Sequence, residues 1–205
     1  MKTGIISGSH RPQSQSEKVS RYIDQRLQDS TWCETSWLLT LANNPLPFWD
    51  ESVWSGGGAW EQHLPALREQ VSSCDAFVIV TPEWHGMVPS GLKNFFLLWA
   101  AGGELAHKPA LIVSVSASDN GAYPVAELRM SSYKNSRLCY LPEHLIVRNV
   151  SQVFNGDDAE NDAESHNYLA GRLGYCLDML GEYASAFRQI RASGKVSLDT
   201  YASGM

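Results

Sequence analysis

Two short apolar runs constrain the fold of this chain more than any other feature of its sequence. Residues 76–80 read AFVIV and residues 110–113 read ALIV, with no polar residue in either run. A strand that is apolar at every position is covered on both faces, as in a parallel sheet between two layers of helices. We therefore expect both runs to be central strands of such a sheet.

Strand-like and helix-like segments alternate along the whole chain. Helices are indicated by apolar residues three and four positions apart, as at Leu92, Phe95, Phe96 and Trp99. We expect strands over residues 3–8, 32–41, 76–80, 108–117 and 144–150, and helices over residues 14–29, 59–73, 89 onward, 122–137 and 164–192. Strict alternation implies right-handed crossovers, so the expected fold class is α/β with three layers.

The domain organisation expected from this pattern is simple. No break in composition marks a second domain, so residues 1–192 are predicted to form one domain. Residues 193–205 are small and polar, and we expect them to form a flexible tail.

Composition argues against several classes of function. A net charge of −6 without a basic cluster disfavours nucleic-acid binding. No apolar run reaches the roughly 18 residues of a membrane span, and the apolar start is too short for a signal peptide. Four cysteines stand far apart without a CxxC pair, which favours reduced thiols in a cytoplasmic protein. The histidines show no ligand spacing, so no metal site is expected.

The loop after the first predicted strand has the composition of an anion site. Residues 8–16 read GSHRPQSQS and lead into a predicted helix. Hydroxyls, an arginine and free amides at a helix N-terminus are the groups that bind phosphate. The loop is neither a Walker loop, which ends in Gly-Lys-Ser/Thr, nor the three-glycine dinucleotide fingerprint. These residues alone leave a capped helix with a surface arginine equally open.

Two further loops follow the central strands. Residues 82–86 read PEWHG, and residues 116–121 read SASDNG. Ligands of open α/β sheets bind where the carboxyl ends of the strands meet. We therefore expect these loops to bind a ligand that carries a phosphate at one end and a flat heterocycle at the other.

Two segments resemble the motifs of the NADPH-dependent FMN reductases. Residues 8–16 are similar to their GSxRxxSxN loop, and TPEWH at 81–85 followed by PSGLKN at 89–94 is similar to their PEYN...PGxLKN segment. The resemblance implies a flavodoxin-like fold with sheet order 2-1-3-4-5 and bound FMN. It also implies a homodimer or homotetramer that uses NADPH or NADH to reduce quinones, azo compounds, metal oxyanions or free flavin.

The resemblance further assigns the residues that would bind FMN. The phosphate would be held by Ser9, Arg11, Ser14, Gln15 and Ser16; the isoalloxazine ring would be lined by Pro82, Glu83, Trp84, His85 and Gly86, chiefly through backbone groups; and its pyrimidine edge would be approached by Ser116, Asn120 and Gly121. No catalytic residue is expected, because a bound flavin itself carries this chemistry.

The chain departs from the family motifs at several positions. Ser16 replaces an Asn, Trp84 and His85 replace Tyr and Asn, and residues 95–98 are all apolar where the family often has an acid. We expect His85 to shape the pocket rather than donate a proton, and Glu83 to face solvent. Four tryptophans at 37, 49, 54 and 60 either pack a long loop locally or reach the active site of a neighbouring subunit.

Two other functions remain open at this level. The first is an FMN-binding electron carrier or redox sensor without substrate turnover of its own, which the acidic charge would suit. The second is a hydrolase of similar fold, although the GxSxG nucleophile elbow is missing.

Overall fold

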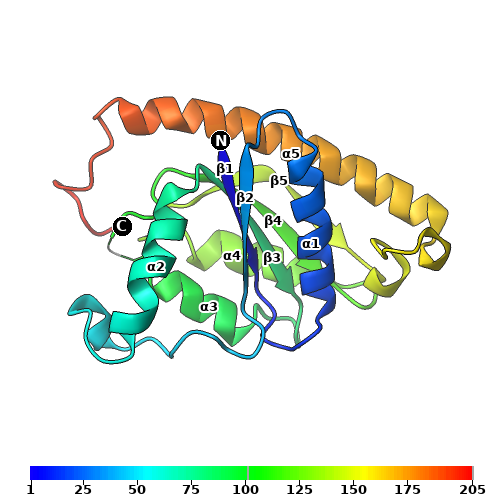
Figure 1. The fold of residues 1–205 in the computed structure, drawn as a ribbon, viewed down its shortest axis with the longest axis horizontal. Coiled ribbons are helices and arrows are strands. Elements are labelled where there is room, and N and C mark those ends of the chain that lie inside the picture. The colour runs from blue at the N-terminus through cyan, green and yellow to red at the C-terminus, as the bar shows by residue number, and fades with distance from the viewer. Residues whose placement is uncertain (101, 205) are drawn as a thin grey trace.

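Five parallel strands form one sheet in the order β2-β1-β3-β4-β5, which confirms the predicted fold class and strand order (Figure 1). The computed structural model describes residues 1–100 and 102–204. The strands are β1 (Lys2–Ser7), β2 (Thr35–Thr40), β3 (Ala76–Pro82), β4 (Pro109–Val115) and β5 (Cys139–Val147). The helices are α1 (Gln15–Gln28), α2 (Trp60–Ser73), α3 (Ser90–Leu97), α4 (Ala122–Ser131) and α5 (Ala163–Ala192).

The sheet separates two hydrophobic clusters. Strands β3 and β4 are buried at every position, which explains the two apolar runs. In β3, Val78 and Val80 belong to the cluster with α1 and α5, whereas Phe77 and Ile79 belong to the cluster with α2, α3 and α4. Figure 1 shows the long α5 crossing the whole molecule along one side of the sheet.

Two elements end at residues that the sequence does not predict. Strand β5 begins at Cys139, five residues before the expected start at residue 144, and contains Pro142, which lies where the register between β4 and β5 shifts. Helix α4 ends at Ser131 rather than near residue 137. The hydroxyls of Ser131 and Ser132 donate to the carbonyls of Glu127 and Leu128, and such bonds compete with continued helix.

The tryptophan-rich segment makes several contacts within the chain. Trp60 is buried at the start of α2, and Trp49 contacts Trp54 edge to face with ring centroids 5.5 Å apart. The side chain of Asn94 accepts the Trp49 N–H at 2.8 Å and donates to the Pro47 carbonyl at 2.8 Å. Trp54 is 70% exposed. Its contact with a neighbouring subunit stays a prediction.

The residues after α5 touch the loop that precedes β5. The Arg137 guanidinium donates to the carbonyls of Tyr201 and Ala202, and the Gly204 N–H donates to the Asn135 side chain. The flexibility expected of this tail stays a prediction. Within the part of the chain that the structure describes, no helix combines the length and the apolar character needed to cross a bilayer.

Lys108 is a buried ammonium just before β4. It is 5% exposed, and its Nζ donates to the carbonyls of Val71 and Ser72 at 3.0 and 2.8 Å, at the end of α2. Burial is the main cause that lowers the pKa of Lys108 from its usual 10.5 to about 8. The folded pKa therefore lies below the unfolded value.

This shift predicts a pH-dependent stability. The unfolded chain binds the Lys108 proton up to about pH 10.5 and the folded chain only to about 8, so stability from this group rises with pH across that window and is lost as pH falls toward 8. Against a Lys108→Met variant, the wild type should gain about 1 kcal/mol in the free energy of unfolding between pH 8 and 9. Urea denaturation at pH 7, 8 and 9 measures this gain.

The exposed Lys195→Met substitution is the control, and its pH profile should run parallel to the wild type. Parallel profiles for Lys108→Met as well would contradict the prediction. The series stops at pH 9 because burial raises the pKa of the Cys74 thiol to about 11, which acts in the opposite sense at higher pH.

Candidate functional site

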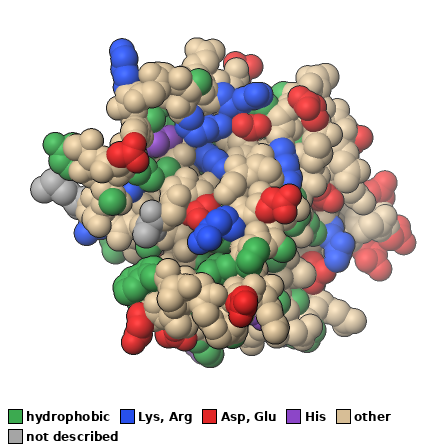
Figure 2. Space-filling view, turned by 60° about the vertical axis from the view of Figure 1, so that its left-hand side comes forward, with side chains coloured by type: hydrophobic (Ala, Val, Ile, Leu, Met, Phe, Trp, Pro, Cys, Tyr) green, Lys and Arg blue, Asp and Glu red, His purple; other side chains and the backbone are tan. Residues whose placement is uncertain are grey.

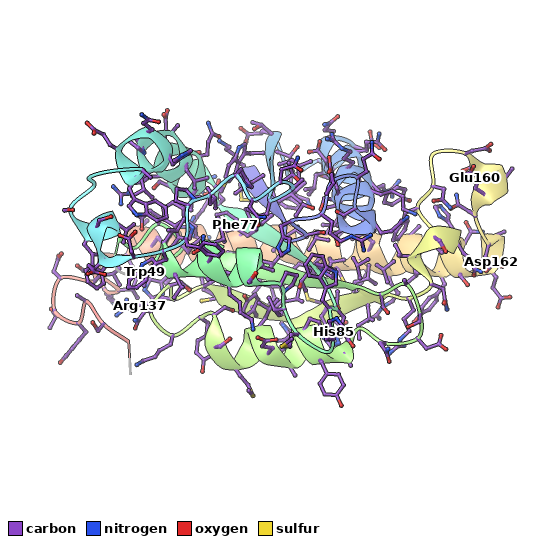
Figure 3. All side chains as sticks on the ribbon, turned by 90° about the horizontal axis from the view of Figure 1, so that it is seen from below. Trp49, Phe77, His85, Arg137, Glu160 and Asp162 are labelled. Atoms are coloured by element: carbon purple, nitrogen blue, oxygen red, sulfur yellow. The ribbon has the colours of Figure 1, made fainter. Side chains whose placement is uncertain are left out.

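Three loops meet at the sheet edge where β1, β3 and β4 end. Figure 3 looks onto this edge, with His85 at the edge and Trp49 well apart from it, on the side of α2. The Gly8 N–H donates to the Val80 carbonyl at 2.7 Å, so the first loop starts in contact with β3. A Cβ on Gly8 would lie 2.8 Å from that carbonyl oxygen and 2.7 Å from Leu92 Cδ2. Only glycine fits there.

The first loop gathers hydroxyls at the N-terminus of α1. Ser14 is the N-cap, and its Oγ accepts the Glu17 N–H at 3.1 Å. Ser9 and Ser16 are each 1% exposed, and Ser9 Oγ accepts the Arg11 N–H at 3.3 Å. The other amides of the first turn have no acceptor inside the helix. This end of α1 can therefore bind an anion.

Arg11 and Gln15 are more exposed than the serines of the first loop. Both residues are exposed, whereas Ser14 is half-buried. The site thus combines buried hydroxyls with an exposed cation at its rim. An arginine in this position can give a phosphate two parallel hydrogen bonds.

The second loop is a tight turn between paired residues. Trp84 and Met87 exchange both backbone hydrogen bonds, at 3.1 and 2.9 Å. The two residues between them, His85 and Gly86, have φ of 51° and 75°. Positive φ at both central positions is the pattern of a type I′ turn, which favours Asn-Gly. His85 lies exposed at its tip.

This turn predicts that His85→Asn stabilises the protein. An L-residue with left-handed backbone costs about 1–2 kcal/mol, and Asn tolerates it better than most residues. We expect a gain of about 0.5 kcal/mol in the free energy of unfolding, because Asn offsets part of that cost. Gly86→Ala is the opposite control, with an expected loss of about 1 kcal/mol. A loss of stability in His85→Asn, measured by urea denaturation, would contradict the turn geometry.

Two side-chain contacts join the second loop to its neighbours. The His10 and Trp84 rings meet edge to face with centroids 4.6 Å apart, which ties the second loop to the first. The Glu83 Oε2 accepts the Gly121 N–H at 2.7 Å, which ties it to the loop after β4. The expectation that Glu83 faces solvent is therefore wrong. Glu83 is partly buried, and its carboxylate accepts the N–H of Gly121, the N-cap of α4.

The loop after β4 is held by the segment after β5. The Ser116 N–H donates to the Val147 carbonyl at 2.9 Å, and Asn149 Nδ2 donates to Asp119 at 3.1 Å. Gly121 has φ of 110°, and a Cβ there would lie 2.6 Å from Ile146. A glycine is thus required where α4 begins.

Lys18 anchors this same segment to α1. Its Nζ donates to the carbonyls of Val150 and Val153 at 2.7 and 2.8 Å and to the Asn155 side chain at 2.6 Å. Burial lowers the pKa of Lys18, while the nearby Glu160 acts in the opposite direction. The three acceptors fix the segment beside the first helix.

A family model of the NADPH-dependent FMN reductases matches residues 1–152. The chain belongs to this family. The matched residues include all three loops at the sheet edge, and they end within the segment that Lys18 holds.

Curated reductases match parts of the chain. An NADPH azoreductase of Bacillus sp. (strain OY1-2) is 27% identical over 124 residues, which cover 59% of this chain and 62% of that protein. A quinone reductase of Escherichia coli (strain K12) is 40% identical over 73 residues, which cover 35% of this chain and 38% of that protein. The matches thus span less than two thirds of either relative.

Solved structures of reductases share the fold over nearly the whole chain. The flavoenzyme NAD(P)H:(acceptor) oxidoreductase FerB of Paracoccus denitrificans superposes with a TM-score of 0.67 at 17% identity, covering 91% of this chain and 98% of that one. The NADH:FMN oxidoreductase EMOB in its apo form gives 0.58 at 14% identity, covering 100% and 94%. At these identities the likeness concerns the fold.

The residues that the FMN reductase motifs assign fall into three groups by exposure. Buried are Ser9, Ser16, Pro82, Ser116 and Gly121; partly buried are Ser14, Glu83, Trp84 and Gly86; exposed are Arg11, Gln15, His85 and Asn120. All of them lie at the edge where the strands end. The binding roles given to them stay predictions.

Two residues of this edge were not singled out from the sequence. His10 occupies a variable position of the phosphate motif, and its partner Trp84 is distant in sequence. Asn149 carried one usable signal, an Asn just after a strand, and its φ of 47° shows the left-handed turn that such residues favour.

A cavity lies outside this edge, and the described residues form no cluster typical of a metal site. A cavity of about 430 Å³ lies between α3 and α4, lined in part by Val88, Phe96 and Leu128, and it contains none of the predicted site residues. Over residues 1–100 and 102–204, no three His, Cys, Asp or Glu side chains come together as a metal site.

Proposed function

We propose that this chain is an FMN-dependent NAD(P)H oxidoreductase that passes two electrons through bound flavin to a quinone, an azo compound, a metal oxyanion or free flavin. The observation that carries the proposal is the contact between its two motif loops. We call residues 8–16 the phosphate loop and residues 83–88 the ring loop. The ring centroids of His10 in the phosphate loop and Trp84 in the ring loop are 4.6 Å apart, so groups suited to phosphate and to a flat ring lie side by side.

The donor set fits the phosphate of FMN. Ser9 and Ser16 are buried hydroxyls at a helix N-terminus, and Ser7 Oγ, at the end of β1 just before the loop, has no hydrogen-bond partner among the described residues. A buried hydroxyl without a partner is uncommon, and an anion or water at this site would satisfy it. Arg11 would add a charged hydrogen bond from the rim.

The ring loop fits a flat heterocycle. Trp84 offers an indole held edge-on by His10, and the turn at His85 and Gly86 exposes backbone groups. Ser116 and the segment at Asn120 would bound the other edge. When bound, FMN supplies the redox chemistry by taking a hydride from a nicotinamide. The protein positions the two partners, and we assign no catalytic acid or base.

The remaining assignments follow from the same proposal. We place the function in residues 1–192 and the protein in the cytoplasm, in agreement with its four free thiols. Basic and acidic side chains are interspersed on the face shown in Figure 2, which supports a small-molecule partner rather than a nucleic acid.

An exposed apolar surface supports self-association. Tyr123 and Met130 are exposed on α4, Tyr133 is exposed just after it, and Met87 and Leu97 are each about half exposed before and in α3. Large apolar side chains exposed on a protein surface are often found at protein interfaces. We propose a homodimer or homotetramer, and light scattering of the purified protein measures its mass.

Purified protein tests the proposal directly. Protein reconstituted with FMN should be yellow and should oxidise NADPH or NADH in the presence of menadione. Protein that binds FMN but is inert to both nicotinamides would instead be an electron carrier or redox sensor, the alternative function. Failure to bind FMN at all would overturn both and reopen the hydrolase reading.

A further inference from the structure

The ring loop is held at both ends by carboxylates. At its start, Glu83 Oε2 accepts the Gly121 N–H at 2.7 Å. At its end, Glu127 Oε2 accepts the Val88 N–H at 2.7 Å. The first bond joins the loop to the N-cap of α4 and the second joins it to a residue within α4, so the loop is attached to this helix at two points.

The stretch between these two anchors is also fixed. Trp84 and Met87 exchange two backbone bonds, and His10 packs against the Trp84 ring. Glu83 itself continues the sheet, because its N–H donates to the Val115 carbonyl at 3.0 Å. A side chain in this stretch therefore has little freedom to move away from the sheet edge.

The two carboxylates differ in their charge partners. Glu127 is paired with Lys93, whose Nζ lies 2.5 Å from Glu127 Oε1. Glu83 forms no ion pair within residues 1–100 and 102–204. Its negative charge is balanced only by the N-terminus of α4, where a carboxylate is favourable. The ring loop thus carries one fixed, unpaired negative charge.

The Gly121 amide lies at the N-terminal end of α4. A free amide at the start of a helix is a ready donor to a negatively charged group. In this chain that amide already serves Glu83. A ligand at this edge therefore meets a carboxylate where it would otherwise meet an open anion donor.

We propose that Glu83 positions the ring loop through Gly121 and that its charge makes the site favour oxidised over reduced flavin. This inference rests on the proposed function. Reduction adds negative charge to the flavin, and a nearby fixed carboxylate opposes it. The site then binds reduced FMN less tightly than a neutral site would, so the bound cofactor becomes a stronger reductant.

Two substitutions of Glu83 separate position from charge. Glu83→Gln keeps an oxygen that can accept the Gly121 N–H and removes the charge. Glu83→Ala removes both. Glu127→Gln is the matched control, because it alters an equivalent carboxylate bond at the far end of the loop. For each protein, FMN affinity is measured by fluorescence quenching, the midpoint potential by spectroelectrochemistry, and Gly121 amide exchange by NMR without FMN.

The expected results differ for each variant. Glu83→Gln should keep the Kd of oxidised FMN within about threefold and tighten reduced FMN about tenfold, which raises a two-electron potential by about 30 mV. Glu83→Ala should raise the Kd of oxidised FMN about tenfold and speed Gly121 amide exchange by a similar factor. Glu127→Gln should leave the potential and Gly121 exchange near wild type.

Two outcomes would overturn the inference. An unchanged potential in Glu83→Gln would remove the role of the charge, and unchanged Gly121 exchange in Glu83→Ala would remove the positioning role. If the wild type takes up no FMN, the proposed function and the charge role both fail. The exchange comparison still decides the positioning role, because it needs no cofactor.

Discussion

Replacing Gly8 with alanine is expected to lower the free energy of unfolding by about 2–3 kcal/mol, the upper range for an overpacked site. The new Cβ would lie 2.8 Å from the Val80 carbonyl oxygen, which is backbone of the central strand and cannot turn aside. It would also meet Leu92 of α3 at 2.7 Å. Urea denaturation followed by tryptophan fluorescence measures the loss.

The same substitution should also disturb the phosphate loop. Relief of the clash moves residues 8–10 away from β3 and with them the contact between His10 and Trp84. We therefore expect weaker FMN binding in addition to lower stability. Gly156→Ala is the control, since nothing lies within 4 Å of a Cβ at that glycine. Equal midpoints for the Gly8→Ala variant and the wild type would contradict the close approach of the two strands.

Removing the Arg11 side chain should weaken FMN binding by about 1.5–3 kcal/mol, the usual worth of a hydrogen bond to a charged group. The fold should be unaffected, because the side chain is exposed and the Ser9 contact uses only the Arg11 backbone N–H. Titration of the Arg11→Ala apoprotein with FMN measures the effect. Arg11→Lys should recover part of the affinity, as a point charge without the paired geometry.

Arg26→Ala provides the matched control for Arg11→Ala. Arg26 is also exposed and lies in the last turn of α1, the helix that follows the loop of Arg11, so the variant changes the net charge equally but away from the loop. Its FMN affinity should stay near that of the wild type. Equal affinities for the wild type and Arg11→Ala would show that the phosphate is bound elsewhere.

The sequence predicts those parts of the fold that depend on local pattern. The apolar runs at 76–80 and 110–113 become strands that are buried throughout. Parallel order follows from alternation, and the strand order came from the family resemblance. Each of these depends on neighbours in sequence or on motifs of known fold.

The parts that the sequence does not predict depend on distant partners. Glu83 reads as a surface acid until the structure places the Gly121 amide, 38 residues later, against it. The early start of β5 includes Pro142, which is accommodated at a register shift against β4, and that pairing is a property of the whole fold. The role of His10 likewise depends on where β3 brings Trp84.

The Asn94 side chain has a consequence for how this protein can diversify. Its carboxamide forms hydrogen bonds with the backbone of Pro47 and Trp49, and the side chain of Phe48 between them is 78% exposed. Because these hydrogen bonds use main-chain atoms, they do not depend on which side chains the segment carries. The outward side chain of this segment can therefore be replaced by mutation or by design, and Trp49 of the segment lies well apart from His85 at the sheet edge (Figure 3).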